Sequence, residues 1–84
     1  MPKVEIGKVS DFFSRPVVAG IELTATLKQS DKIHIKGHTT DVEFIIDSMQ
    51  IDNVNVEQAK AGDAIGIKVS ERVRRGDTVY KVID

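Results

Sequence analysis

The nearest approach to a metal site in this sequence consists of two histidines and one aspartate. His34 and His38 are four residues apart, and Asp41 follows three residues later. A structural zinc site needs four ligands and a catalytic one needs three plus a water. The spacing would bring two imidazoles together on a helix, but we expect His34 in a strand and His38 in a loop. We therefore interpret both as solvated surface residues and predict no bound metal and no cofactor.

The sequence also lacks the common catalytic and phosphate-binding motifs. It has no cysteine, which excludes thiolate chemistry. No serine lies in a G-x-S-x-G elbow, and no glycine-rich phosphate-binding loop is present. Scattered aspartates are better interpreted as turn formers. We predict that the chain is not an enzyme and does not bind GTP by itself.

Three arginines within four residues are the strongest candidate for binding. Arg72, Arg74 and Arg75 lie in a predicted loop, where guanidinium groups can contact phosphates. Aromatic rings near Arg15 could stack on a base. The alternative is a solvated loop whose charges pair with neighbouring acidic residues. The predicted RNA-binding set is Arg72, Arg74, Arg75, Arg15, Lys8 and Phe13.

Composition predicts the elements that must position these residues. Of the 84 residues, 11 are valine, 10 are isoleucine and five are threonine, against two leucines. β-Branched side chains favour strands over helices. Twelve basic and 13 acidic residues give a net charge of −1, so no global field attracts nucleic acid. The lack of cysteine is typical of a cytoplasmic protein, and the small number of asparagine and glutamine residues weakly favours a thermophilic source.

Alternating apolar residues place the strands. Residues 17–27 give the clearest alternation, and residues 32–36, 64–69 and 78–83 follow the same rule. Residues 4–9 change parity near Gly7, which suggests a bulge, and residues 42–51 change parity near Asp47. Residues 11–15 are expected to be a loop and residues 53–61 the one helical turn. The predicted interior consists of Ile6, Ala19, Ile21, Leu23, Ile33, Ile35, Ile65, Ile67 and Val79. We therefore predict an all-β fold in a single domain, residues 1–84, forming a small closed antiparallel Greek-key β-barrel of about six strands.

An ordered series of short segments resembles domain II of Tu-type translation elongation factors. The segments are GKV (7–9), VVAG (17–20), LKQSDKI (27–33), SMQI (48–51), AKAGDAIGI (59–67) and RGDTV (75–79). The chain is also similar to the small C-terminal barrel of collagenase-like peptidase-family proteins involved in RNA modification, and to stand-alone archaeal copies of that module. Ser30 departs from the family pattern, which has glycine there, and the GTPase domain is missing.

The resemblance implies a barrel that contacts tRNA or ribosomal RNA through residues 51–54 and 69–75. The leading hypothesis is a non-enzymatic module that binds RNA or a ribonucleoprotein. The alternative is a protein–protein interaction module that docks onto a larger enzyme. Convergence of the arginines with Lys8, Arg15 or Lys68 would favour RNA, whereas an exposed apolar patch would favour protein.

Overall fold

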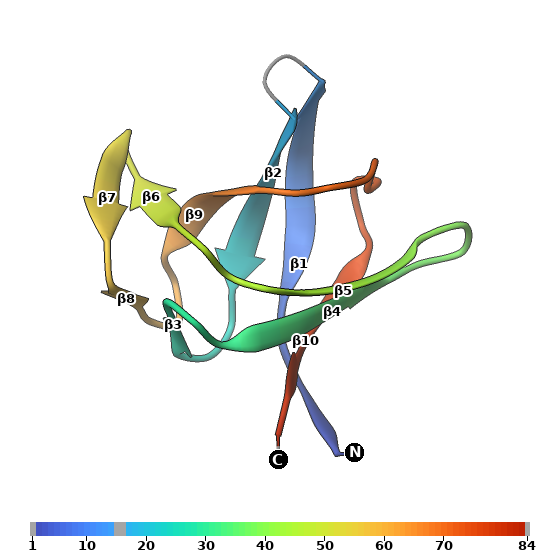
Figure 1. Cartoon of the computed structure of the whole chain (residues 1–84), viewed down its shortest axis with the longest axis horizontal. Helices are drawn as coiled ribbons and strands as arrows, with labels where there is room; N and C mark the ends of the chain where they lie inside the picture. Colours follow the sequence, from blue (N-terminus) through green and yellow to red (C-terminus); the bar gives the residue numbers. More distant parts are fainter. Residues whose placement is uncertain (1, 15–16, 84) are drawn as a thin grey trace.

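The chain forms only β-strands and loops in the part that the structure describes. The computed structural model describes residues 2–14 and 17–83. Ten strands are assigned there, each short except the first (Figure 1). They are β1 (Lys3–Ser14), β2 (Val17–Leu23), β3 (Leu27–Lys28), β4 (Lys32–Lys36), β5 (Asp41–Ile45), β6 (Met49–Ile51), β7 (Val54–Val56), β8 (Gln58–Ala59), β9 (Ala64–Lys68) and β10 (Thr78–Val82).

The strands pair antiparallel throughout. Eight of them form one sheet in the order β5-β4-β10-β1-β2-β9-β6-β7, and β3 pairs with β8. Lys3 lies opposite Val82, so β1 and β10 run side by side, and the start of β1 and the end of β10 lie at the bottom of Figure 1. The far end of β1 and the start of β2 lie at the opposite end of the molecule.

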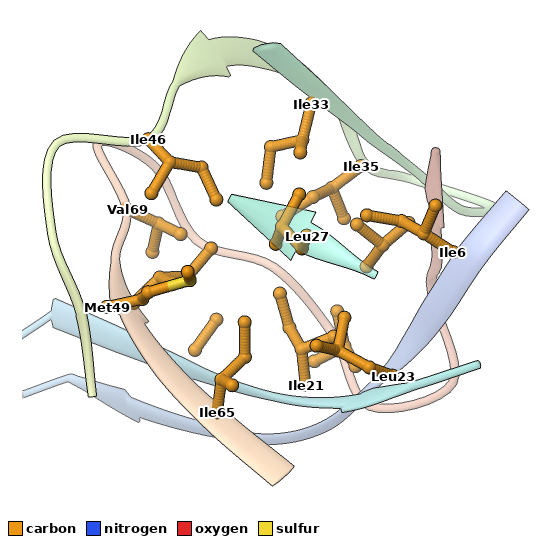
Figure 2. Close-up of a cluster of buried hydrophobic side chains, with 14 of the residues drawn as sticks. Ile6, Ile21, Leu23, Leu27, Ile33, Ile35, Ile46, Met49, Ile65 and Val69 are labelled. Atoms are coloured by element: carbon orange, nitrogen blue, oxygen red, sulfur yellow. The ribbon is translucent and has the colours of Figure 1, made fainter. Parts of the chain in front are cut away.

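One apolar core fills the space that the sheet surrounds. Side chains from strands on all sides point into this common interior (Figure 2). All nine residues predicted to line the interior are buried, which confirms that part of the prediction. Leu27 and Met49 complete the core from β3 and β6, and Val73 adds to it from the loop before β10. At about 1.5–3 kcal/mol for each fully buried large apolar side chain, this burial is the main stabilising term.

Two bulges divide β1. The register shifts between Glu5 and Gly7, as predicted from the parity change, and again between Val9 and Asp11. The first bulge lets Ile6 and Val9 both face the core. β1 can therefore pair with β10 along its first half and with β2 along most of its length.

The structure corrects the predicted element list in three places. The described residues contain ten strands instead of about six, because the long predicted strands break at residues 24–26 and 46–48 and two further strands form within residues 53–61. The segment predicted as a loop continues β1 as far as Ser14, because Phe12 pairs with Ala19 and Phe13 with Val18. Residues 53–61 hold β7 and β8 and no helical turn.

A tight turn explains the missed hairpin between β6 and β7. Asp52 and Asn53 have φ values of 52° and 65°. Positive φ at both central residues is the requirement of a type I′ hairpin turn. This turn pairs Ile51 with Val54 and Met49 with Val56, so the segment continues as a strand.

Across residues 2–14 and 17–83, no helix has the length and apolar character needed to cross a lipid bilayer.

Candidate functional site

The loop of residues 70–77, here called the arginine loop, has a fixed backbone. Val73 is buried in the core with 1% exposure. Gly76 donates its backbone N–H to Val9 at 2.8 Å, and Val9 donates to the carbonyl of Asp77 at 2.9 Å. The loop is thus anchored to β1 at its end and to the core at its middle.

A capped turn fixes the last four residues of the arginine loop. The carboxylate of Asp77, which is 6% exposed, accepts the backbone N–H of Arg74 at 2.8 Å, and Gly76 has a φ of 92°. The same arrangement recurs at residues 28–31 and 60–63, each with a basic first residue and a capping aspartate. Positive φ at only the third residue is typical of a type II turn.

The three arginines differ in their surroundings. Arg75 donates to the carboxylate of Asp11 on β1 at 2.9 Å. Arg72 and Arg74 lie on either side of buried Val73 and are exposed. No acidic side chain of residues 2–14 or 17–83 forms an ion pair with either of them. Two guanidinium groups are therefore available to a ligand, and the third is already paired.

A groove runs between the arginine loop and the end of the β1–β2 hairpin. Two adjoining hollows of about 420 and 440 Å³ share Phe12 and Arg72 in their walls. We call them together the arginine groove, with an arginine end and a Val17 end. The arginine end is lined by Phe12, Arg72, Val73, Arg74 and Arg75, and the Val17 end by Phe12, Ser14, Val17, Ser70, Glu71 and Arg72.

Phe13 does not belong to this groove. It lines a separate hollow of about 470 Å³ with Val18, Gly66 and polar residues of the β6–β7 hairpin, and it is 57% exposed. Neighbouring residues of a strand point to opposite faces. Phe12 packs against the core and is the aromatic wall beside the arginines. The structure therefore places Phe12 beside the arginine cluster, where the predicted RNA-binding set had Phe13.

The other predicted residues contribute little to the groove. Lys8 is exposed on β1, opposite Thr78 and Glu22, and is not in the groove lining. Lys68 lines a different hollow. Arg15 lies outside the described residues. Of the described positions named for convergence, neither Lys8 nor Lys68 lines the groove with the three arginines.

His34 is buried, contrary to the predicted solvated position. The residue is 6% exposed, and Lys3 of β1, Tyr80 of β10 and Asp41 of β5 surround its ring. The ammonium group of Lys3 can only donate, so it donates to Nδ1, and Nε2–H then donates to the carboxylate of Asp41. This hydrogen bond from His34 lowers the pKa of Asp41 below its ordinary value of 3.8.

This network leaves little chemistry for the imidazole. Both ring nitrogens of His34 are engaged, so neither offers a lone pair to a metal. His38 is exposed. No group of three or more His, Cys, Asp or Glu side chains within residues 2–14 and 17–83 is placed to hold a metal ion. We interpret the network as a polar contact that joins β1, β4 and β5.

Comparison with known proteins gives matches to segments of proteases. No protein-family model matches the chain. An uncharacterized protease of Methanocaldococcus jannaschii is 48% identical over 79 residues, which cover 93% of this chain and 19% of that protein. A collagenase of Porphyromonas gingivalis is 36% identical over 81 residues, covering 94% of this chain and 20% of its own length. The chain thus spans about a fifth of the length of these curated relatives.

Solved structures show the same fold. The C-terminal domain of a Geobacillus thermoleovorans protein, provisionally named a U32 peptidase, superposes with a TM-score of 0.88. The superposition covers 94% of this chain and 92% of that domain at 12% identity. Its selenomethionine variant gives a TM-score of 0.85. The chain is therefore homologous to one segment of collagenase-like proteases and has the fold of the C-terminal domain of a U32-type peptidase.

Proposed function

We propose that this chain is a non-catalytic accessory domain that docks onto the body of a larger collagenase-like enzyme. One observation carries the proposal: similarity extends over 93% of this chain but only 19% of the M. jannaschii protease. What this chain matches is thus one small module beside a much larger remainder. A peptidase activity in such a protein would reside mainly in that remainder, which we call the body.

The chemistry of the chain supports a binding role over a catalytic one. Its most buried titratable cluster, around His34, is internally satisfied. The arginine groove is open and holds two guanidinium groups that lack acidic partners among residues 2–14 and 17–83. Such a surface can bind anionic groups through charge-assisted hydrogen bonds. Its lining includes the hydroxyl groups of Ser14 and Ser70 but no histidine that could activate them as nucleophiles.

RNA binding is the weaker candidate. It rests on the arginine loop alone, and the curated relatives are named as proteases. A net charge of −1 provides no general attraction to a polyanion. The resemblance to translation-factor barrels concerns the fold, and binding of tRNA or ribosomal RNA stays a prediction.

The proposal includes a closed barrel as the scaffold. Backbone hydrogen bonds join Ile46, beyond β5, to Ser30 at 3.0 Å and to Asp31 at 2.9 Å. Another joins Gln29 to Glu57 at 2.9 Å. These bonds support closure of the curved sheet through the β3–β4 turn and β8. Strong hydrogen-exchange protection of the Ile46 amide is the expected sign of that closure.

Docking can be tested with the M. jannaschii relative. The matched 79-residue segment is deleted from that protein to leave the body, and this chain is then added back. We expect a one-to-one complex by sedimentation. The intact relative is the matched control, since its own segment already occupies the docking surface, and it should bind the added chain far more weakly. A folded body that forms no complex at high micromolar concentration, or gelatin hydrolysis by this chain alone, would contradict the proposal.

A further inference from the structure

We propose that the arginine groove binds an acidic, extended peptide segment of the enzyme body, with carboxylates at the arginine end. This inference rests on the proposed function, because it names the chemistry of the partner that docks. Its first support is the charge distribution. Arg72 and Arg74 have no ion-pair partner among residues 2–14 and 17–83, whereas Arg75 has Asp11.

The groove is polar at one end and partly apolar at the other. No acidic side chain lines the arginine end. At the Val17 end, Val17 is 39% exposed and Phe12 forms the shared wall, while Glu71 is the acidic residue of the lining. A carboxylate is therefore favoured at the arginine end, which is lined by three arginines and no acidic side chain, over the Val17 end, where Glu71 offsets Arg72. In an extended segment, the next side chain on the same face lies about 6.6 Å further along. An apolar side chain there would meet the Phe12 and Val17 walls of the groove.

The backbone of the site is fixed before any ligand arrives. Val73 is anchored in the core, and the turn capped by Asp77 holds Arg74. Arg72 and Arg74 project outward on either side of this anchor. A loop that is already ordered loses little conformational entropy on binding, which favours affinity. The guanidinium fork matches a carboxylate in two-point geometry.

The same observations favour a peptide over RNA. The groove lining contains no lysine, and only two guanidinium groups lack acidic partners in the described chain. Two guanidinium groups can pair with the carboxylates of a short acidic peptide, but they neutralise only a few phosphates of a polynucleotide. Two contacts to single-stranded RNA give a salt slope of about −1.4, which is weak binding.

The test uses labelled peptides and paired variants. The probe is a fluorescent Glu-Ser-Glu-Ser-Leu-Ser-Leu peptide, which when extended places two carboxylates and then two apolar side chains along one face. Versions carrying Gln or Lys at every Glu and a ten-nucleotide oligouridine serve as comparisons. The variant combines Arg72→Ala with Arg74→Ala. Its matched control combines Lys28→Ala with Lys60→Ala, because these lysines are exposed first residues of the two equivalent turns. Circular dichroism checks that each variant is folded.

We expect at least a tenfold loss of Glu-peptide affinity in the arginine variant and less than a twofold change in the lysine control. Arg72→Glu with Arg74→Glu should exchange the preference, so that the Lys peptide binds in place of the Glu peptide. Equal affinity for the Glu and Gln peptides, equal loss in both double variants, or tighter binding of oligouridine that depends on the arginines would overturn the inference.

The body-binding assay separates this inference from the proposed function. If the body binds the wild type and the arginine variant equally well, docking stands and the arginine groove is not its site. If the body binds neither protein, the proposed function itself is wrong. Loss of body binding only in the arginine variant, together with competition by the Glu peptide, supports both.

Discussion

Replacing Ser30 with glycine should stabilise the protein. Ser30 has a φ of 77°, while the equivalent positions of the two matching turns are Gly62 at 94° and Gly76 at 92°. The left-handed region costs a residue with a Cβ about 1–2 kcal/mol. Glycine removes that cost but loses about 0.5–1 kcal/mol through its greater freedom in the unfolded chain. The expected net gain is about 0.5–1 kcal/mol in the free energy of unfolding.

The reverse change at the matching turn provides the control. A Cβ at Gly62 would meet no atom within 4 Å, so Gly62→Ser tests backbone conformation without a steric clash. It should lower stability by about the amount that Ser30→Gly raises it. Because 1 kcal/mol shifts the Tm of a domain this size by about 4–8 °C, each change should move it by about 2–8 °C, in opposite directions.

Urea unfolding followed by far-UV circular dichroism measures both effects. The urea midpoint should change while the m-value stays constant, since the surface exposed on unfolding is unaltered. A stability loss in Ser30→Gly would show that the serine side chain makes a stabilising contribution absent from the hydrogen bonds described. No effect in Gly62→Ser would refute the claim that positive φ governs these turns.

Three further tests concern the rest of the structure. Asp77→Ala should lower the free energy of unfolding by about 1.5–3 kcal/mol, because a buried charge-assisted hydrogen bond is lost. Asp63→Ala removes the same bond at an exposed turn and should lower it less. Equal losses in urea titration would contradict the role of burial. Asp41 has a lowered pKa in the folded state, so its stabilising effect is present above about pH 4 and is lost as the pH falls through the folded pKa. Asp41→Asn should therefore reduce the difference between the urea midpoints measured at pH 6 and at pH 2.5. An unchanged difference would refute this role of Asp41. Gly66→Ala should not lower the free energy of unfolding, because the added Cβ would make only an ordinary 3.6 Å contact. Gly7→Ala would place the Cβ 2.4 Å from a backbone oxygen, so thermal unfolding should show a loss of about 1–3 kcal/mol in stability. A larger loss for Gly66→Ala than for Gly7→Ala would disprove the packing described.

Sequence patterns predicted the core residues correctly wherever one face of a strand is buried and the other face is exposed to solvent. That condition holds in β2 and β9, so simple alternation identified Ile21 and Ile65 as interior. It fails in β7, whose side chains are mostly exposed and whose hairpin depends on positive φ at Asp52 and Asn53. Aspartate and asparagine adopt that conformation less often than glycine, so the pattern gave no hairpin signal.

The candidate site was predictable only in part for a related reason. The arginines are neighbours in sequence, so their clustering needs no fold. The choice of Phe12 over Phe13 depends on the second bulge of β1, which reverses the facing of every later residue in that strand. The burial of His34 depends on Lys3, 31 residues away, and local pattern contains no information about that contact.

β10 lies in the interior of the sheet although it follows the other nine described strands in the sequence. It separates β4 from β1, so among the described residues the β4–β5 hairpin pairs with the rest of the sheet only through residues 78–81. Pairing such as Lys3 with Val82 spans nearly the whole sequence, which raises contact order and slows folding. Until β10 is available, β1 and β4 each have an unpaired edge. An incomplete chain would therefore expose two open strand edges, which are the usual starting points for association between molecules.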